Sequence, residues 1–343
     1  MTYRVFMLSM LALVLLLSML AALMLGAVSL PMMDMLHGLQ RLFGFAVNSD
    51  AAQRAELILG QIRLPRLMMG VLVGAVLAVC GVAMQGLFRN PLADPGLVGV
   101  SSGAALGAAI AIVGLANMGQ VAEALSPYIL VLSAFLGGLL VTMVVYQLAR
   151  RDGEIRLATM LLAGIALNAL AAAMIGLLTY LADDATLRSL TFWNLGSLNG
   201  ATYQRLWPLL FITLFIVFWI PRRAKALNAL LLGDSEARHL GVRVERLKLE
   251  LIACTALGVG AAVSAAGLIG FIGLVVPHLM RLLLGPDHRY LIPASALAGA
   301  ALLLIADVFA RLVLLPAELP IGIVTALIGA PFFLYLLRRE RLS

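Results

Sequence analysis

The sequence predicts an all-α, multi-pass membrane protein with ten membrane-spanning helices. Of its 343 residues, 63% are hydrophobic and only 12% are charged, against roughly 25% charged in an ordinary soluble domain. The apolar residues gather in long segments, and a helix needs about 20 such residues to cross the hydrocarbon core of a bilayer. Only a helix or a closed barrel satisfies every backbone polar group there. We therefore predict that these segments are helices.

The ten predicted spans follow one another along a single membrane domain, residues 1–343. No linker, low-complexity run or internal repeat divides this chain. The first span follows Arg4, as in a signal peptide, but it is longer than the 7–15 apolar residues of a signal-peptide core, and we expect a retained helix. The spans are Val5–Leu30, Leu64–Met84, Gly96–Leu115, Ser126–Leu148, Leu157–Leu181, Leu206–Ile220, Leu249–Leu268, Gly270–Leu284, Tyr290–Leu312 and Leu319–Leu337.

The basic residues set the orientation of these spans. Most of the 24 lysines and arginines fall in segments that share one side if the N-terminus is inside. The positive-inside rule then places both termini in the cytoplasm. Residues 31–62 and 182–205 are expected outside, the first as short surface helices. The inner segments carry Arg4, Arg89, Arg150, Arg151, Arg156, the basic residues of 222–248, Arg281, Arg289, Arg338, Arg339 and Arg341.

The spans hold few ionisable groups. Ion-coupled carriers and intramembrane enzymes place such groups deep in the bundle, but here the spans carry few, among them His278, Arg281, Asp307 and Arg311. We expect no catalytic residue and no metal site, and His278 is interpreted as either a ligand or a hydrogen-bonded structural residue. The net charge of +7 requires no nucleic acid.

Energy for transport must then come from another subunit. A P-loop requires GxxxxGK[ST], and neither of the two lysines, Lys225 and Lys248, stands in that motif. The segment "LLLGDSEARHLGVRVERLK" is a candidate contact for such a subunit. Gly233 can end one short helix, Asp234 or Ser235 can cap the next, and Gly241 can end it. From these residues alone, a docking knob and a solvated loop are equally good interpretations.

Six motifs in order resemble one family over nearly the whole chain. They are "RLPR" (63–66), "GVAMQGLFRNPLADPGLVGVSSGA" (81–104), "LLLGDSEARHLGV" (230–242), "GFIGLVVPHLMR" (270–281), "ADVFAR" (306–311) and "ELPIGIVTALIGAPFF" (318–333). The chain is similar to permease subunits of binding-protein-dependent (type II) ABC importers for iron-siderophores, heme and cobalamin. The resemblance implies ten helices per subunit, a homodimer in the bacterial inner membrane, two cytoplasmic ATPase subunits that carry ATP and Mg, and a periplasmic substrate-binding protein.

The resemblance also implies roles for particular residues. The ATPase-coupling positions are Gly233, Asp234, Glu236, Ala237, Arg238 and Gly241. A cytoplasmic gate includes Asn90 and Leu92, on an elbow that Pro91 and Pro95 keep from being helical. A second gate element falls at Leu157 and Ala158, where the polar pattern of the family is missing.

The resemblance further implies that three arginines at the outer surface bind acidic side chains of the binding protein. They are Arg63, Arg66 and Arg311, and the planar guanidinium suits a carboxylate. The alternative has Arg63 and Arg66 reaching lipid headgroups and Arg311 pairing with Asp307 one turn earlier.

The transported ligand is expected to be heme, with a ferric siderophore or cobalamin as alternatives. The fifth span, 157–181, lines the path by resemblance and offers small and apolar side chains. Such a path suits a bulky chelate and disfavours bare metal ions, which need carboxylate, imidazole or thiolate ligands. The outer segment "LADDATLRSLTFWNLGSLNGA" resembles heme permeases most, whereas its "WNLGSL" (193–198) fits heme and siderophore permeases alike. We expect no cofactor bound by this chain itself.

Overall fold

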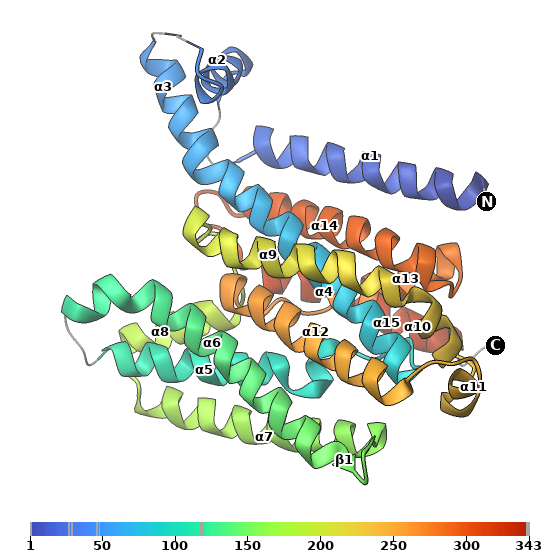
Figure 1. Ribbon diagram of the computed structural model, residues 1–343. Helices are drawn as coiled ribbons and strands as arrows, with labels where there is room; N and C mark the ends of the chain where they lie inside the picture. Colours follow the sequence, from blue (N-terminus) through green and yellow to red (C-terminus); the bar gives the residue numbers. More distant parts are fainter. Residues whose placement is uncertain are drawn as a thin grey trace.

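The described apolar helical segments form one bundle in the computed structural model (Figure 1). The structure describes residues 2–26, 28, 30–45, 47, 49–116 and 120–340. Seven of the segments are long and apolar enough to cross a membrane, and three are shorter: Tyr3–Met24, Asp50–Phe88, Tyr128–Ala149, Leu157–Leu181, Tyr203–Leu230, Val244–Ala266, His288–Leu312, Val100–Ala116, Ile272–Leu284 and Ile321–Leu334. They correspond one to one to the ten predicted spans, and the predicted all-α class is confirmed.

The described residues are mostly helical, and the sheet among them has two strands. Two short strands, β1 (Arg150–Arg151) and β2 (Glu154–Ile155), pair antiparallel. The helices are α1 (Thr2–Met24), α2 (Met32–Leu42), α3 (Asp50–Leu57), η1 (Ile58–Arg63), α4 (Leu64–Phe88), η2 (Pro95–Val98), α5 (Val100–Ala116), α6 (Gln120–Ala149), α7 (Leu157–Leu181), α8 (Asp184–Asn194), α9 (Tyr203–Trp219), η3 (Ile220–Arg223), α10 (Ala224–Leu230), α11 (Asp234–His239), α12 (Val244–Ala266), α13 (Ile272–Leu284), α14 (His288–Leu312) and α15 (Ile321–Glu340).

Two predicted boundaries need correction. The second span is not separate from the outer segment before it, because α3, η1 and α4 form one continuous helical run. Pro65 has no backbone N–H for the preceding turn, and the chain passes through the π turn η1 there. The third span begins at Val100 rather than Gly96, because Pro95 to Val98 form the 3₁₀ turn η2 and Gly99 takes a φ of 81°.

Helix α4 is the centre of the bundle. It packs against α9, α12, α13 and α14, and most of its side chains are buried. Glycines let the backbones approach closely: a Cβ at Gly74 would lie 2.8 Å from the Cα of Ala300, and one at Gly103 would lie 2.5 Å from the carbonyl oxygen of Gly137. Close backbone packing through small residues is a main source of helix association in membranes.

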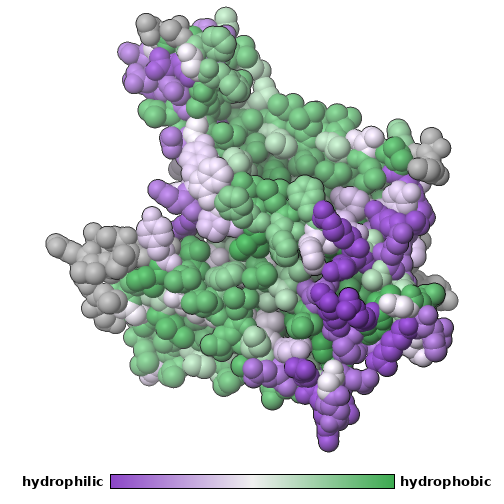
Figure 2. All heavy atoms as spheres, viewed as in Figure 1, coloured by the Kyte–Doolittle hydropathy of each residue, from purple (hydrophilic) through white to green (hydrophobic). Residues whose placement is uncertain are grey.

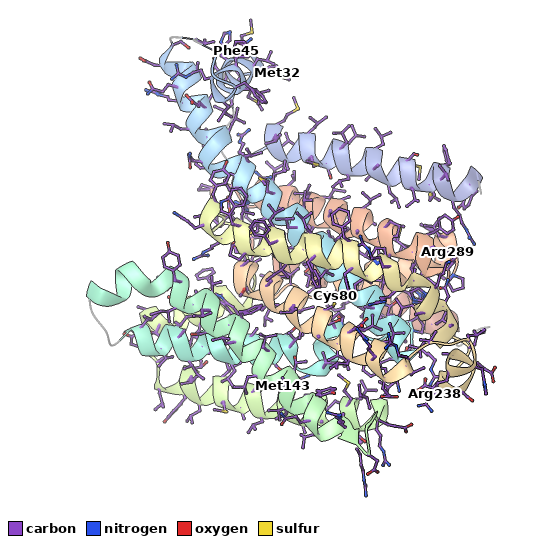
Figure 3. The ribbon with its side chains drawn as sticks, in the orientation of Figure 1. Met32, Phe45, Cys80, Met143, Arg238 and Arg289 are labelled. Atoms are coloured by element: carbon purple, nitrogen blue, oxygen red, sulfur yellow. The ribbon has the colours of Figure 1, made fainter. Side chains whose placement is uncertain are left out.

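Charged residues gather at one end of the bundle, which we call the basic end. Figure 2 shows a hydrophilic surface there beside a broad hydrophobic one, and Arg238 and Arg289 mark it in Figure 3. Helix α1 begins and α15 ends at this end, where α10, α11 and β1 also lie (Figure 1). Met32 and Phe45 lie at the opposite, outer end (Figure 3). Arg341, one of the arginines predicted inside, lies outside the described residues.

Candidate functional site

The predicted coupling segment forms two short helices at the basic end. Helix α10 is followed by Gly233, with a φ of 119°, and α11 is followed by Gly241, with a φ of 83°. Both glycines occupy backbone conformations that a side chain would strain. The two-helix prediction is thus confirmed, but the predicted cap is wrong. Gly233 takes the N-cap position without a side-chain bond, and the side chain of Asp234 instead pairs with Lys248.

Helix α11 presents both apolar and charged side chains to its surroundings. Ala237 is fully buried against the bundle, whereas Leu232 and Leu240, on either side of the helix, are 66% and 64% exposed. Glu236 and Arg238 are exposed on the same element. A protruding surface of this mixed kind is typical of a contact site for another protein.

Helix α10 is anchored on the beginning of α14. The side chain of Asn228 donates to Asp287 over 2.8 Å and accepts from the backbone N–H of His288 over 2.9 Å. Arg4 of α1 also approaches Asp287, at 3.6 Å. Hydrogen bonds from Arg289, followed by the bond from Asn228, hold the pKa of the Asp287 carboxyl well below its usual range. The first helix and the coupling helices therefore share one charged anchor.

The elbow after α4 interrupts the helix, as its prolines predicted, and local hydrogen bonds hold it. Arg89 ends α4 in the left-handed conformation, with a φ of 50°. The Asn90 side chain accepts a hydrogen bond from the backbone N–H of Leu92 over 2.9 Å, and Asp94 accepts one from Gly96 over 2.7 Å. These local bonds fix the turn that carries Asn90 and Leu92 at the basic end.

The second predicted gate element begins α7 directly after the β1–β2 hairpin. Leu157 is half-buried and Ala158 is exposed. About three turns along α7, Asn168 joins this helix to the elbow. It accepts a 2.5 Å hydrogen bond from the Ser102 hydroxyl, and its amide donates to the carbonyl of Gly96 over 3.4 Å. Sequence reasoning missed Asn168, although a lone amide in an apolar span is itself a pointer to function.

A cavity of about 520 Å³ lies between α4, the elbow, α7 and α12. Its polar lining comes from Asp94, Ser101, Ser102 and Asn168, and most of the remaining lining is aliphatic. Among the described residues, no group of three or more His, Cys, Asp or Glu side chains could hold a metal ion. His278 is buried in α13 and belongs to no such group. The cavity can therefore accept a ligand by shape and a few hydrogen bonds.

The three arginines predicted for docking are brought together at the outer end, but they are buried. Arg63, Arg66 and Arg311 are 4%, 7% and 4% exposed, so their predicted position on the open surface is wrong. Arg63 donates to the carbonyls of Leu23, Met24 and Val28, over 2.5, 3.1 and 2.5 Å. Helix ends leave such carbonyls without partners, which explains why a guanidinium is drawn inward here.

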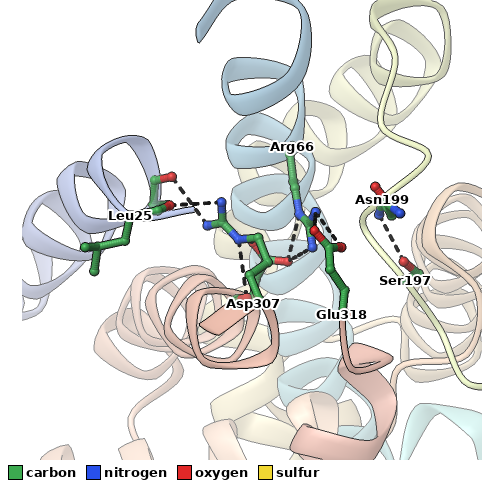
Figure 4. Close-up of polar contacts among 8 residues, drawn as sticks. Leu25, Arg66, Ser197, Asn199, Asp307 and Glu318 are labelled. Carbon is green, nitrogen blue, oxygen red and sulfur yellow. Dashed lines mark hydrogen bonds and ion pairs between the residues drawn. The ribbon is translucent and has the colours of Figure 1, made fainter. Parts of the chain in front are cut away.

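Asp307 is the acidic centre of this arginine cluster (Figure 4). Its carboxylate accepts from Arg66 over 2.9 Å and lies 3.1 Å from Nε of Arg311. Glu318 pairs with Arg66 over 2.9 Å. The alternative pairing of Arg311 with Asp307 is confirmed, whereas Arg63 and Arg66 do not reach outward as headgroup contacts would require.

The cluster nevertheless borders a small pocket. The three arginines and Glu318 line a cavity of about 100 Å³, together with Gly26, Val28, Ile58 and Ile62. Three guanidinium groups face only two carboxylates, Asp307 and Glu318, in this part of the structure. The pocket therefore has one uncompensated positive charge and suits a further carboxylate.

Comparisons with known proteins match this architecture. The sequence profile of the FecCD transport family matches residues 13–339. The chain belongs to the FecCD transport family. It is 49% identical over 280 residues to the hemin transport system permease protein HmuU of Yersinia pestis, covering 82% of this chain and 83% of that protein. It is 44% identical over 288 residues to the vitamin B12 import system permease protein BtuC of Escherichia coli O9:H4 (strain HS), covering 84% and 86%.

Solved structures agree with the family. An inward-facing metal-chelate type ABC transporter superposes with a TM-score of 0.82 at 32% identity, covering 97% of this chain and 98% of that one. PsaBC from Streptococcus pneumoniae, at 18% identity and a TM-score of 0.57, shares the fold. This FecCD protein is therefore a permease subunit of an ABC importer and a multi-pass protein of the bacterial inner membrane. It is not an enzyme, and ATP hydrolysis belongs to a separate subunit. The basic end is the cytoplasmic end.

Proposed function

We propose that two copies of this chain form the path by which heme passes from a periplasmic binding protein to the cytoplasm, driven by two copies of a cytoplasmic ATPase. The observation that carries the choice of heme is the 49% identity to a hemin permease. The 44% identity to vitamin B12 permeases supports cobalamin as the second candidate, and the metal-chelate type neighbour supports a ferric siderophore.

The surface of α7 supports a shared path between two copies. Few of its side chains are buried, and Leu162, Ile165, Leu170 and Leu177 are among the exposed large hydrophobic residues. We place this face toward the second copy and the substrate path. The cavity beside Asn168, with the elbow at its cytoplasmic end, is the part of the path within one protomer. Its aliphatic lining suits a large apolar chelate passed on without coordination.

The coupling helices α10 and α11 transmit the movement of the ATPase to the permease. The ATPase docks on α10 and α11, with Gly233, Asp234, Glu236, Ala237, Arg238 and Gly241 shaping that surface. Binding and hydrolysis of ATP then move these helices and displace the Asn90–Leu92 elbow and the Leu157–Ala158 turn. Rigid elements joined by glycine turns are suited to such a movement.

The binding protein docks at the outer end through the pocket beside Arg63, Arg66 and Arg311. An acidic side chain that enters this pocket would pair with the uncompensated guanidinium charge. Because the arginines are already held by backbone carbonyls and by Asp307, they are preorganised for the incoming carboxylate. Docking therefore requires little rearrangement of the permease.

Reconstitution in liposomes tests the proposal. The chain is combined with its ATPase and binding protein, and uptake of heme, cyanocobalamin and a ferric siderophore is measured side by side. We expect heme uptake only when all three proteins and ATP are present. Cobalamin or siderophore uptake in place of heme would select that alternative, and heme uptake without the ATPase would overturn the mechanism.

A further inference from the structure

A buried lysine lies where the coupling helices meet the bundle. Lys248, in the second turn of α12, has a side chain only 4% exposed, whereas Lys225, the other lysine of the chain, is exposed. The Lys248 ammonium lies 2.7 Å from Asp234 of α11 and 3.0 Å from Glu245. It also donates to the carbonyl of Ile155 over 3.4 Å. These partners use all three of its donors.

One branch of this network leads to α7. The Glu245 carboxylate accepts the backbone N–H of Ile155 over 2.8 Å, so Glu245 and Lys248 together hold both polar groups of that peptide residue. Arg238 of α11 adds an ion pair to Glu154 on the same strand, over 3.0 Å. Because α7 begins at Leu157, two residues after Ile155, a displacement of β2 moves the start of α7 directly.

A second branch leads to the elbow. Asp234 lies 3.6 Å from Arg89 in addition to its contact with Lys248. Arg89 is the residue that ends α4, in the left-handed conformation, and Asn90 follows it. The same carboxylate of α11 is therefore connected to both gate elements, through Arg89 to the elbow and through Lys248 to β2 and α7.

The surroundings of α11 allow it to move as one unit. It lies between Gly233 and Gly241, both with positive φ, while α12 is packed into the core along most of its length. A lysine fixed on α12 thus forms a firm support against which α11 can turn. We propose that the ion pairs of Lys248 with Asp234 and Glu245 transmit movement of α11 to both gate elements. This inference rests on the proposed function.

Replacement of Lys248 by Gln should leave the fold intact, so that a loss of coupling can be told from a loss of structure. Burial of an ion pair commonly stabilises little, because desolvation offsets the attraction. Asp234 and Glu245 are 29% and 28% exposed at their side chains, so water can hydrate both carboxylates once the lysine is replaced. The Lys248→Gln protein is therefore expected to fold, assemble with its ATPase and hydrolyse ATP.

The test measures transport per ATP in liposomes that contain the complete complex. Lys248→Gln should lower the heme transported per ATP at least about fivefold, within the range of coupling energies between contacting residues, with copurification of the ATPase unchanged. Lys248→Arg keeps the charge and should retain most coupling. Arg151→Gln is the matched control, because Arg151 is exposed on the same hairpin and pairs only with its neighbour Asp152 among the ion pairs of the described residues.

The two branches are separated by gate movements. Spin labels at Leu92→Cys or Ala158→Cys report distances between the two copies with and without ATP, and the native Cys80 and Cys254 are buried. Arg89→Gln should abolish the ATP-driven change at position 92 only, and Glu245→Gln that at position 158 only. Lys248→Gln should reduce both changes. If Lys248→Gln does not fold, Arg89→Gln and Glu245→Gln still decide the question.

Two results would overturn the inference. One is unchanged transport per ATP in Lys248→Gln, and the other is equal loss of both gate movements in Arg89→Gln and Glu245→Gln. Either result would leave the proposed function intact, provided the unaltered complex shows ATP-dependent uptake. Absence of such uptake in the unaltered complex would instead contradict the proposed function.

Discussion

Replacement of Asp307 by Asn should destabilise this permease severely. The Asp307 side chain is 2% exposed and binds two buried arginines, with Arg66 at 2.9 Å and Arg311 at 3.1 Å. Removing one partner of a buried ion pair leaves uncompensated charge and costs about 3–5 kcal/mol. Here two guanidinium groups lose their shared carboxylate. We therefore expect a loss of at least about 3 kcal/mol in the free energy of unfolding, since charge-assisted hydrogen bonds contribute about 1.5–3 kcal/mol each.

Unfolding by SDS in mixed micelles, followed by circular dichroism, measures this loss. Glu318→Gln is an informative comparison, because the Glu318 side chain is 25% exposed and, within the described part of the chain, forms an ion pair with Arg66 alone. Its loss should cost about 1 kcal/mol, near the upper range of partly exposed pairs. Asp184→Asn, at an exposed carboxylate of α8, is the control and should change stability by less than about 0.5 kcal/mol. An Asp307→Asn protein within about 1 kcal/mol of the unaltered one would refute this account of the cluster.

Three further predictions concern docking, the gate and the dependence on pH. Arg63→Gln should weaken the affinity for the binding protein about tenfold or more, the equivalent of about 1.4 kcal/mol, as measured by surface plasmon resonance at moderate salt. Replacement of the exposed Arg54 by Gln is the control and should leave the affinity unchanged. Equal affinities of the two variants would exclude the pocket as the docking site. Asn168→Leu removes the bonds to Ser102 and Gly96 and should raise ATP-independent leakage of substrate from liposomes several-fold. Unchanged leakage would show that Asn168 does not help to close the path. Because the pKa of Asp287 is lowered in the folded protein, its contribution to stability is present above the ordinary aspartate pKa of about 3.9 and is lost as the pH falls below it. Asp287→Asn should therefore reduce the change of the melting temperature with pH between pH 5 and 3. An unchanged pH dependence would be evidence against the stabilising role of Asp287.

The fold could be predicted almost completely because it depends on composition. Apolar segments of membrane length and arginines on one side determine the ten spans and their orientation. Gly233 and Gly241 could also be assigned, since their conformations are local properties of glycine. The continuous run of α3, η1 and α4 was missed, because a proline near a helix start is normally read as a boundary.

The side-chain partners could not be predicted, because they come from distant segments. Arg63 binds carbonyls about 40 residues earlier, and Arg66 binds Asp307 and Glu318 far later in the chain. No local pattern indicates that such arginines turn inward. Lys248 was noted only as one of two lysines, and its contacts with Asp234 and Ile155 depend on how α11 and the hairpin meet. Asn168 could have been singled out from its polarity within an apolar span.

The central claim is that ATP hydrolysis by a partner, and no ion gradient, drives substrate through this permease. The most direct measurement follows heme uptake into liposomes that hold the complete complex, first with an ATPase subunit disabled for hydrolysis and then with a protonophore. We predict that uptake is lost in the first case and unchanged in the second. Uptake that survives without ATP and collapses with the proton gradient would contradict the account.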